Sequence, residues 1–145
     1  MFKKILIPVD GSSFSEAVLP HAQTLAKKYD ATVHLLRVQS PDPYEPPWGV
    51  VLTAIPEPLQ VRPADQLELL AQRLKIEGVS TSIEVAEGHT AEAILDCAKH
   101  SHADLIAMTT HGRSGLGRWW LGSVADKVVR ASHIPVLLVR PEEPA

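Results

Sequence analysis

The sequence has little cysteine and little excess of charge of either sign, and it has no long apolar run. Its single thiol, Cys97, excludes an internal disulfide. No apolar stretch approaches the roughly 20 residues that a membrane-spanning helix needs, and the N-terminal stretch is too short for a signal peptide. The formal net charge of −3 and the pI of about 6.1 provide no electrostatic footprint for nucleic acid. These absences predict a cytoplasmic protein that binds neither a membrane nor nucleic acid.

Metal-binding motifs are also missing from the sequence. Its seven histidines show neither HxxxH nor HExxH spacing, so we expect no metal site. Cys97 follows Ile94 by three residues on a helical pattern, which favours a place in the core over a role as nucleophile. What the sequence does have is 145 residues with 45% apolar content. That is enough for one domain, residues 1–145, with a proper hydrophobic core.

Short apolar stretches alternate with amphipathic stretches along the chain. The apolar stretches predict five strands, at residues 3–9, 32–38, 80–86, 103–108 and 135–139. The amphipathic stretches predict four helices, which we expect to begin near Ser13, at about residue 64, at Thr90 and at Ser123. Ser13 and Glu16 have the spacing of a capping box, although Pro20 then requires a kink or a later start. Gly78 is placed to end the second helix at its C′ position.

The alternation of strand and helix predicts a doubly wound parallel sheet of five strands with helices on both faces. In such sheets a ligand binds beyond the carboxyl ends of the strands, where the direction of winding reverses. If that reversal separates the first and fourth strands, Asp10 and the loop after Met108 face each other across one crevice. Residues 39–63 interrupt the alternation, because they hold seven of the twelve prolines and predict a long, partly extended insertion.

The loop between the fourth strand and the last helix carries four glycines between Met108 and Ser123. Glycine lets the backbone approach a ligand closely, and the unpaired N–H groups and dipole of a helix N-terminus favour an anion. Ser123 is expected to cap the helix and to offer its hydroxyl to a phosphate. Neither GxxxxGK[ST] nor a GxGxxG directly after the strand is present. Composition alone therefore weighs a phosphate-binding loop evenly against an ordinary surface loop.

Four segments of the chain resemble the universal stress protein family: ILIPVDGS, ADLIAM, HGRSGLGRWWLGSVADKVV and IPVLLVR. Together they extend the resemblance over essentially the whole chain. The family implies a five-stranded parallel sheet in the order 3-2-1-4-5, with dimers formed through the last strand. One branch of the family binds ATP through a motif of Gly, two residues, Gly, nine residues, and then Gly followed by Ser or Thr.

Gly112, Gly122 and Ser123 match the last three positions of that motif, whereas Thr109 stands where the family has its first glycine. The resemblance implies nucleotide contacts from both sides of the crevice. Pro8 and Val9 would line its floor, and Asp10 and Val38 would contact adenine or ribose. Val124 would offer its N–H to a phosphate. The implied contacts along the loop are Met108, Thr109, His111, Gly112, Arg113, Gly115, Gly122 and Ser123. Asp10 also has the simpler possible role of capping a turn, and Arg113 that of a solvated loop charge.

The resemblance therefore implies a stress-response or signalling module that binds ATP, with or without Mg²⁺, and acts through its nucleotide-bound state. No catalytic residue is assigned. One alternative is a slow ATPase or phosphoryl-transfer enzyme, for which only Asp10 and Asp126 are candidate carboxylates. Another is an interaction scaffold without a ligand, for which the β-carbon of Thr109 is the argument.

The closing strand, residues 135–139, is strongly apolar and is expected at an edge of the sheet. An exposed apolar edge is an aggregation hazard unless it is paired or covered. Pairing with the same strand of a second copy predicts a homodimer. In the alternative, residues 39–63 cover that edge within one chain.

Overall fold

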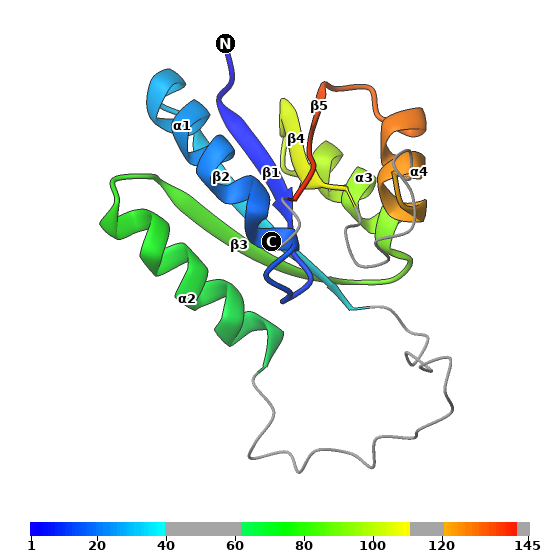
Figure 1. Ribbon diagram of the computed structural model, residues 1–145, viewed down its shortest axis with the longest axis horizontal. Coiled ribbons are helices and arrows are strands. Elements are labelled where there is room, and N and C mark those ends of the chain that lie inside the picture. Colours follow the sequence, from blue (N-terminus) through cyan, green and yellow to red (C-terminus); the bar gives the residue numbers. More distant parts are fainter. Residues whose placement is uncertain (40–61, 111–120, 142–145) are drawn as a thin grey trace.

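A computed structural model describes residues 1–39, 62–110 and 121–141 of the chain (Figure 1). The strands are β1 (Lys4–Pro8), β2 (Thr32–Gln39), β3 (Thr81–Glu87), β4 (Leu105–Thr109) and β5 (Val136–Val139). The helices are α1 (Leu19–Tyr29), α2 (Pro63–Ile76), α3 (Thr90–His100) and α4 (Ser123–Ala131), with a short 3₁₀ helix, η1 (Ser15–Val18), before α1. Almost all of the predicted 39–63 insertion lies outside the described residues, and so do residues 111–120.

The five strands form one parallel sheet in the order β3-β2-β1-β4-β5, which confirms the predicted topology. Leu6 of the central β1 lies opposite His34 of β2 on one side and Ile106 of β4 on the other. The chain winds outward from β1 to β3 and then returns across the sheet to β4 and β5 (Figure 1). The winding therefore reverses between β1 and β4, as the crevice hypothesis requires.

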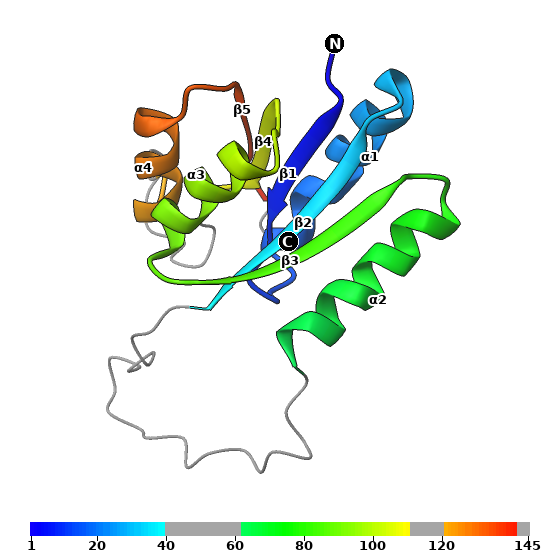
Figure 2. The ribbon, with the colours of Figure 1, turned by 180° about the vertical axis from the view of Figure 1, so that it is seen from behind.

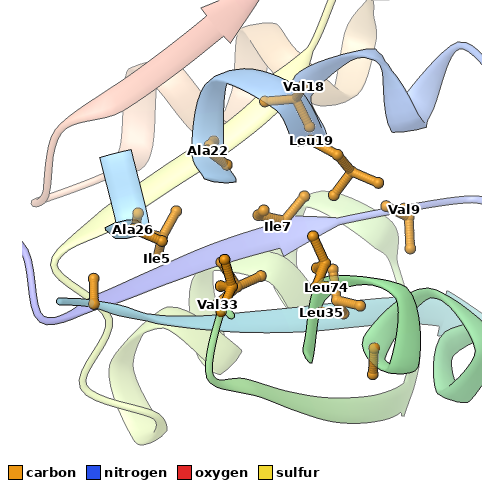
Figure 3. Close-up of a cluster of buried hydrophobic side chains, with 14 of the residues drawn as sticks. Ile5, Ile7, Val9, Val18, Leu19, Ala22, Ala26, Val33, Leu35 and Leu74 are labelled. Atoms are coloured by element: carbon orange, nitrogen blue, oxygen red, sulfur yellow. The ribbon is translucent and has the colours of Figure 1, made fainter. Parts of the chain in front are cut away.

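Helices cover both faces of the sheet, with α1 and α2 on one face and α3 and α4 on the other (Figures 1 and 2). Toward α1 and α2, Ile5 and Ile7 of β1 and Leu35 of β2 pack with Ala22 and Leu74 (Figure 3). A strand that is buried on both faces needs apolar residues at successive positions. The near-continuous apolar character of β1 follows from this requirement.

The second apolar cluster lies on the opposite face, where Leu6 and Ile106 of the sheet pack with Ile94 and Cys97 of α3 and Val128 of α4. Cys97 is fully buried, so its predicted place in the core is confirmed. Full burial of an aliphatic side chain such as Leu6 or Ile94 contributes about 1.5–3 kcal/mol. The two clusters thus hold all four helices against the sheet.

The first helix begins later than the capping-box spacing predicted. Residue Phe14 precedes η1 without a side-chain cap hydrogen bond, so the capping box of Ser13 and Glu16 is wrong. The α-helix starts at Leu19, which places Pro20 in its first turn and confirms the later start. Proline is tolerated there because the N–H groups of the first turn have no partner within the helix. Glu16 instead faces Arg73 of α2.

Two predicted N-caps are also displaced by one residue. His89 and Gly122, rather than Thr90 and Ser123, precede the first helical residues of α3 and α4. Gly122 has φ +80° and ψ 150°, a conformation that residues with a β-carbon rarely adopt, so the chain enters α4 one residue before the serine.

The predicted end of α2 at Gly78 is confirmed. Gly78 has φ +90°, and its N–H donates to the carbonyl of Lys75 at 3.0 Å. The N–H of Val79 donates to the carbonyl of Leu74 at 2.9 Å, which completes a Schellman motif. Glycine meets the positive φ of this motif without steric cost.

The outer strands of the sheet are β3 and β5, so the predicted edge position of the closing strand is confirmed. The side chains of β5 are all partly exposed. Val136 and Leu138 pack toward α3 and α4, whereas Leu137 and Val139 pack toward α1. None of the helices within the described ranges is long and apolar enough to cross a membrane.

Candidate functional site

A cavity of about 490 Å³ lies beyond the carboxyl ends of β1 and β4, at the point where the winding reverses. Every predicted site residue that the structure describes lines this cavity: Pro8, Val9, Asp10, Val38, Met108, Thr109, Gly122, Ser123 and Val124. The remaining predictions, for His111, Gly112, Arg113 and Gly115, fall on residues 111–120, outside the described ranges.

The floor of the cavity is apolar. Pro8 ends β1, and the N–H of Val9 donates to the carbonyl of Leu36 at 2.8 Å, which continues the ladder one residue further. Val9 and Met108 are buried, and Val38 of β2 is partly buried beside them. Such a floor suits a flat apolar group, and the polar groups around its rim can orient a ligand.

Asp10 stands at the exposed mouth of the cavity, in a tight turn that holds its carboxylate. The N–H of Ser12 donates to Oδ1 of Asp10 at 2.8 Å, and the Ser12 hydroxyl donates to the same oxygen. Behind them, Oγ of Ser15 accepts the N–H of Asp10 at 3.1 Å and donates to the carbonyl of Ser12 at 2.9 Å. The turn-capping role considered for Asp10 is therefore present, and it leaves the carboxylate at the cavity wall.

The carboxylate of Asp10 is held in its ionised form. Burial opposes ionisation, but the hydrogen bonds from Ser12, the nearby Ser15 hydroxyl and the positive charge of Arg37 outweigh it and lower the pKa of Asp10. The Arg37 guanidinium lies against Gly11, whose φ of +86° also favours glycine. At neutral pH the mouth of the cavity thus presents a negative oxygen pair, a suitable acceptor for hydroxyl or amino groups of a ligand.

The opposite wall is the N-terminus of α4. The carbonyl of Gly122 accepts the first helical hydrogen bond, from the N–H of Asp126 at 3.0 Å. The N–H groups of Ser123, Val124 and Ala125 consequently have no partner within the helix, and all three residues line the cavity. Their donors and the helix dipole favour an anion on this side.

Five lining residues were missed by the sequence reasoning: Ser15, Thr90, Ile94, Leu121 and Ala125. Thr90 and Ile94 belong to α3, which begins just beyond the carboxyl end of β3. Because all carboxyl ends of a parallel sheet meet at one edge, the predicted topology already contained the signal for Thr90. Ser15 had no comparable signal, because its contact depends on the late start of α1.

The protein is an α/β protein with a doubly wound parallel sheet. Its cleft lies at the switch point, the edge at which ligands bind in sheets of this kind. The chain belongs to the universal stress protein family, whose model matches residues 1–140.

Relatives in sequence and in structure extend over nearly the whole chain. Universal stress protein MJ0531 of Methanocaldococcus jannaschii is 36% identical over 97% of this chain and 83% of its own length. The structure of universal stress protein UspA from Lactobacillus plantarum matches with a TM-score of 0.72 and 27% identity, over 96% of this chain and 98% of that one. A universal stress protein solved in complex with cAMP has the same fold, with a TM-score of 0.70 and 22% identity over 96% of this chain and 97% of that one.

Proposed function

We propose that this universal stress protein binds ATP in the cleft between β1 and β4 and acts in the cytoplasm as a stress-response or signalling module through its nucleotide-bound state. One observation carries the proposal. Every described residue that the family resemblance implies as a nucleotide contact lines a single cavity, although these residues come from four separate parts of the chain. Their convergence supports a common ligand.

The apolar floor and the carboxylate support the placement of adenosine on the β1 side. Val9, Val38 and Met108 form a surface on which a purine can lie, and Asp10 stands beside it as an ionised acceptor. A carboxylate accepts hydrogen bonds from two ribose hydroxyls or from an exocyclic amine. The universal stress protein complexed with cAMP is a case of an adenine nucleotide bound by a protein of this fold.

The N-terminus of α4 supports the placement of the phosphates on the opposite side. Ser123 and Val124 offer backbone donors, and Ser123 adds a hydroxyl. Gly112, the second glycine of the motif, lies outside the described residues. Asp10 is the one carboxylate among the described lining residues. Mg²⁺ would therefore be coordinated mainly by the phosphate oxygens of ATP and would keep several of its water ligands.

The alternative of a slow ATPase gains no support from Asp126. This carboxylate is engaged with Nε of Arg130 at 3.0 and 3.1 Å, and it is not among the described lining residues of the cavity. Asp10 alone is a poor candidate general base, because its lowered pKa makes it a weak proton acceptor. We therefore propose a binding function and assign no catalytic residue.

We further propose that the protein forms a homodimer through β5. The strand is an edge of the sheet, and its partly exposed side chains are all apolar. A two-fold axis beside it pairs the strand antiparallel with its own copy. The alternative, in which the 39–63 segment covers this edge, concerns residues almost entirely outside the described ranges.

Replacing Asp10 with asparagine tests the adenosine side. The variant keeps the shape of the side chain and an acceptor for Ser12, but it loses the charge. A hydrogen bond to a charged group contributes about 1.5–3 kcal/mol, so the affinity for ATP should fall roughly 10- to 100-fold in a calorimetric titration. Asp30→Asn makes the same change at the C-terminus of α1, far from the cleft, and should leave the affinity unchanged. Equal affinities for wild type and Asp10→Asn would remove Asp10 from the site.

Thr109→Gly tests the departure from the family motif. Thr109 ends β4 and pairs with Val139, so its backbone is already fixed by the sheet. If its side chain is accommodated in the cleft, the substitution should change the ATP affinity less than about tenfold, or 1.4 kcal/mol. The same titration measures it. A large gain in affinity would mean that the threonine obstructs the phosphates, and it would favour the scaffold alternative.

A further inference from the structure

Helix α3 packs over the face of the sheet that contains β2 and β3 (Figure 2). A second group of reactive side chains comes from these three elements. His34 is on β2, Glu84 on β3 and Cys97 on α3, and one potential ligand atom from each lies within 4.8 Å of the other two. His34 and Cys97 are buried, with 8% and 0% of their surface exposed. The group is separate from the cleft, because none of its three members is among the described residues that line that cavity.

The carboxylate of Glu84 is the centre of this group. Its Oε2 lies 2.9 Å from Nε2 of His34 and 3.3 Å from Sγ of Cys97. Its Oε1 lies 2.8 Å from Nε2 of His100, at the exposed end of α3. The other ring nitrogen of His34, Nδ1, lies 2.7 Å from Oγ of Ser82. Strands β2 and β3 and helix α3 thus contact one another through polar side chains, inside a layer that is otherwise apolar.

We propose that His34, Glu84 and Cys97 form a binding site for a zinc-class divalent transition metal ion. Imidazole nitrogen, carboxylate oxygen and thiolate sulfur are the three ligand types that Zn²⁺ takes in proteins, and three protein ligands with a water complete a tetrahedral site. His100, farther out, is a positioning residue that holds Glu84 from the solvent side.

Two of the three donor separations, those that involve Glu84, require only a small adjustment, and the third, between His34 and Cys97, is within 4.8 Å. Donor atoms at zinc–ligand lengths of about 2.0–2.3 Å lie roughly 3.3–3.6 Å apart around a tetrahedral ion. The Sγ–Oε2 separation is 3.3 Å, and the Nε2–Oε2 separation of 2.9 Å must widen by a few tenths of an ångström. Glu84 can supply this movement, because its side chain is 27% exposed and its neighbour Val85 is at the sheet edge.

Charge favours the ion as well. When the metal ion binds, the thiol of Cys97 gives its proton to solvent, and the sulfur–metal bond replaces the S–H bond. One thiolate, one carboxylate and one neutral imidazole then balance the two positive charges of the ion, so a buried site carries no net charge. Without the ion, burial and the nearby Glu84 raise the pKa of Cys97 to about 12, and the thiol stays protonated.

The surroundings of Cys97 contain an unused donor. Oγ of Ser101 is buried and has no hydrogen-bond partner in the described part of the chain. Ser101 is the C-cap residue of α3, four positions after Cys97. A metal-bound thiolate would give this hydroxyl an acceptor. On the other side of the site, the Ser82 hydroxyl can accept Nδ1–H of His34 and so direct Nε2 toward the metal.

No pattern in the sequence signalled this site, and the expectation that the chain has no metal site rested on spacing alone. His34 and Glu84 are 50 residues apart, and Glu84 and Cys97 are 13 apart. Only the pairing of His34 with Ser82 in the parallel ladder, and the packing of α3 over it, bring the three residues together.

The test is a titration of the chelator-treated, full-length protein with Co²⁺ as a spectroscopic substitute for Zn²⁺. We expect one equivalent to produce thiolate-to-cobalt charge-transfer absorption and tetrahedral ligand-field bands, and Zn²⁺ to displace both. Cys97→Ala should lose the charge-transfer absorption, and Glu84→Gln should bind more than about 10-fold more weakly. His21→Ala, which removes an exposed histidine on α1, is the matched control and should behave as wild type.

A second readout does not depend on the spectrum. Because the ion binds the folded chain, Zn²⁺ should raise the thermal unfolding midpoint of wild type and of His21→Ala, but not that of Cys97→Ala. Circular dichroism without metal establishes that each variant is folded. If Cys97→Ala does not fold, Glu84→Gln is the deciding variant. Absence of thiolate absorption in wild type, or a Glu84→Gln affinity equal to that of wild type, would overturn the proposal.

Discussion

Replacing Gly122 with valine is expected to abolish ATP binding in a chain that remains folded. Gly122 has φ +80°, lines the cavity and immediately precedes three lining residues whose N–H groups have no partner within α4. A β-branched residue is strained in this conformation by about 1–3 kcal/mol, so the backbone should turn away and redirect those donors. We expect the calorimetric affinity for ATP to fall more than about 100-fold, or roughly 2.7 kcal/mol.

Gly78→Val is the matched control for this experiment. Gly78 has a similar φ of +90°, and a β-carbon added to it would meet no other atom within 4 Å. It ends α2 at the far end of the sheet from the cleft. The control should lose a comparable amount of stability and keep its affinity for ATP. If both variants bind ATP as wild type does, or both lose it equally, the phosphates do not lie at Gly122.

A lysine at position 138 should convert the proposed homodimer into monomers. The carbonyl of Pro135 accepts the N–H of Ile106 in β4, and that of Val139 accepts the N–H of Thr110, the residue after β4. Alternation along the strand therefore turns the backbone groups of Val136 and Leu138 away from β4. A second copy of β5 would pair with those outward groups. Two lysines brought together across a two-fold axis repel each other, whereas in the monomer each ammonium can reach water over its apolar stem.

Sedimentation velocity at tens of micromolar measures the effect. Wild type should sediment as a dimer and Leu138→Lys as a monomer, with a dissociation constant raised by about 100-fold or more, roughly 2.7 kcal/mol. Val85→Lys places the same charge on β3, at the opposite edge of the sheet, and should remain dimeric. A wild type that is monomeric at this concentration, or a dimer lost equally in both variants, would contradict pairing through β5.

The parallel sheet with helices on both faces could be predicted from the sequence because its signals are local and agree with one another, whereas the strand order was implied by the family resemblance. Near-continuous apolar runs such as Ile5–Ile7 can be buried only between two layers of helices, and the alternation with amphipathic segments then restricts the topology. Gly78 was predicted correctly for the same reason. A C′ position requires a positive φ, which favours glycine at that one residue whatever the tertiary structure around it.

The features that could not be predicted depend on tertiary structure. Ser13 and Glu16 satisfy a local capping rule, yet Glu16 faces Arg73 of α2 and the helix begins at Leu19. Likewise, Cys97 was predicted as a core residue, which is correct, but its contact with Glu84 could not be seen before the register of β3 and the position of α3 were known. The number of residues between two positions in the sequence carries no information on such contacts.

For the candidate site, the family resemblance named residues on both sides of the cleft. It included Asp10 and Val124, which the structure brings to one cavity. It omitted Ser15, whose hydroxyl supports the Asp10 turn, because that contact arises from the 3₁₀ turn ahead of α1. The resemblance thus named residues that line the cavity and missed one that holds the Asp10 turn in place.

A titration of the ¹⁵N-labelled protein with ATP, followed through its amide NMR shifts, tests most directly whether ATP occupies the cleft between β1 and β4. We predict saturable shifts at the amides of Asp10, Ser123 and Val124, with those of Asp30 and Gly78 unmoved. ATP binding that shifts only amides outside the cleft, or no shift at millimolar ATP, would contradict the proposed site.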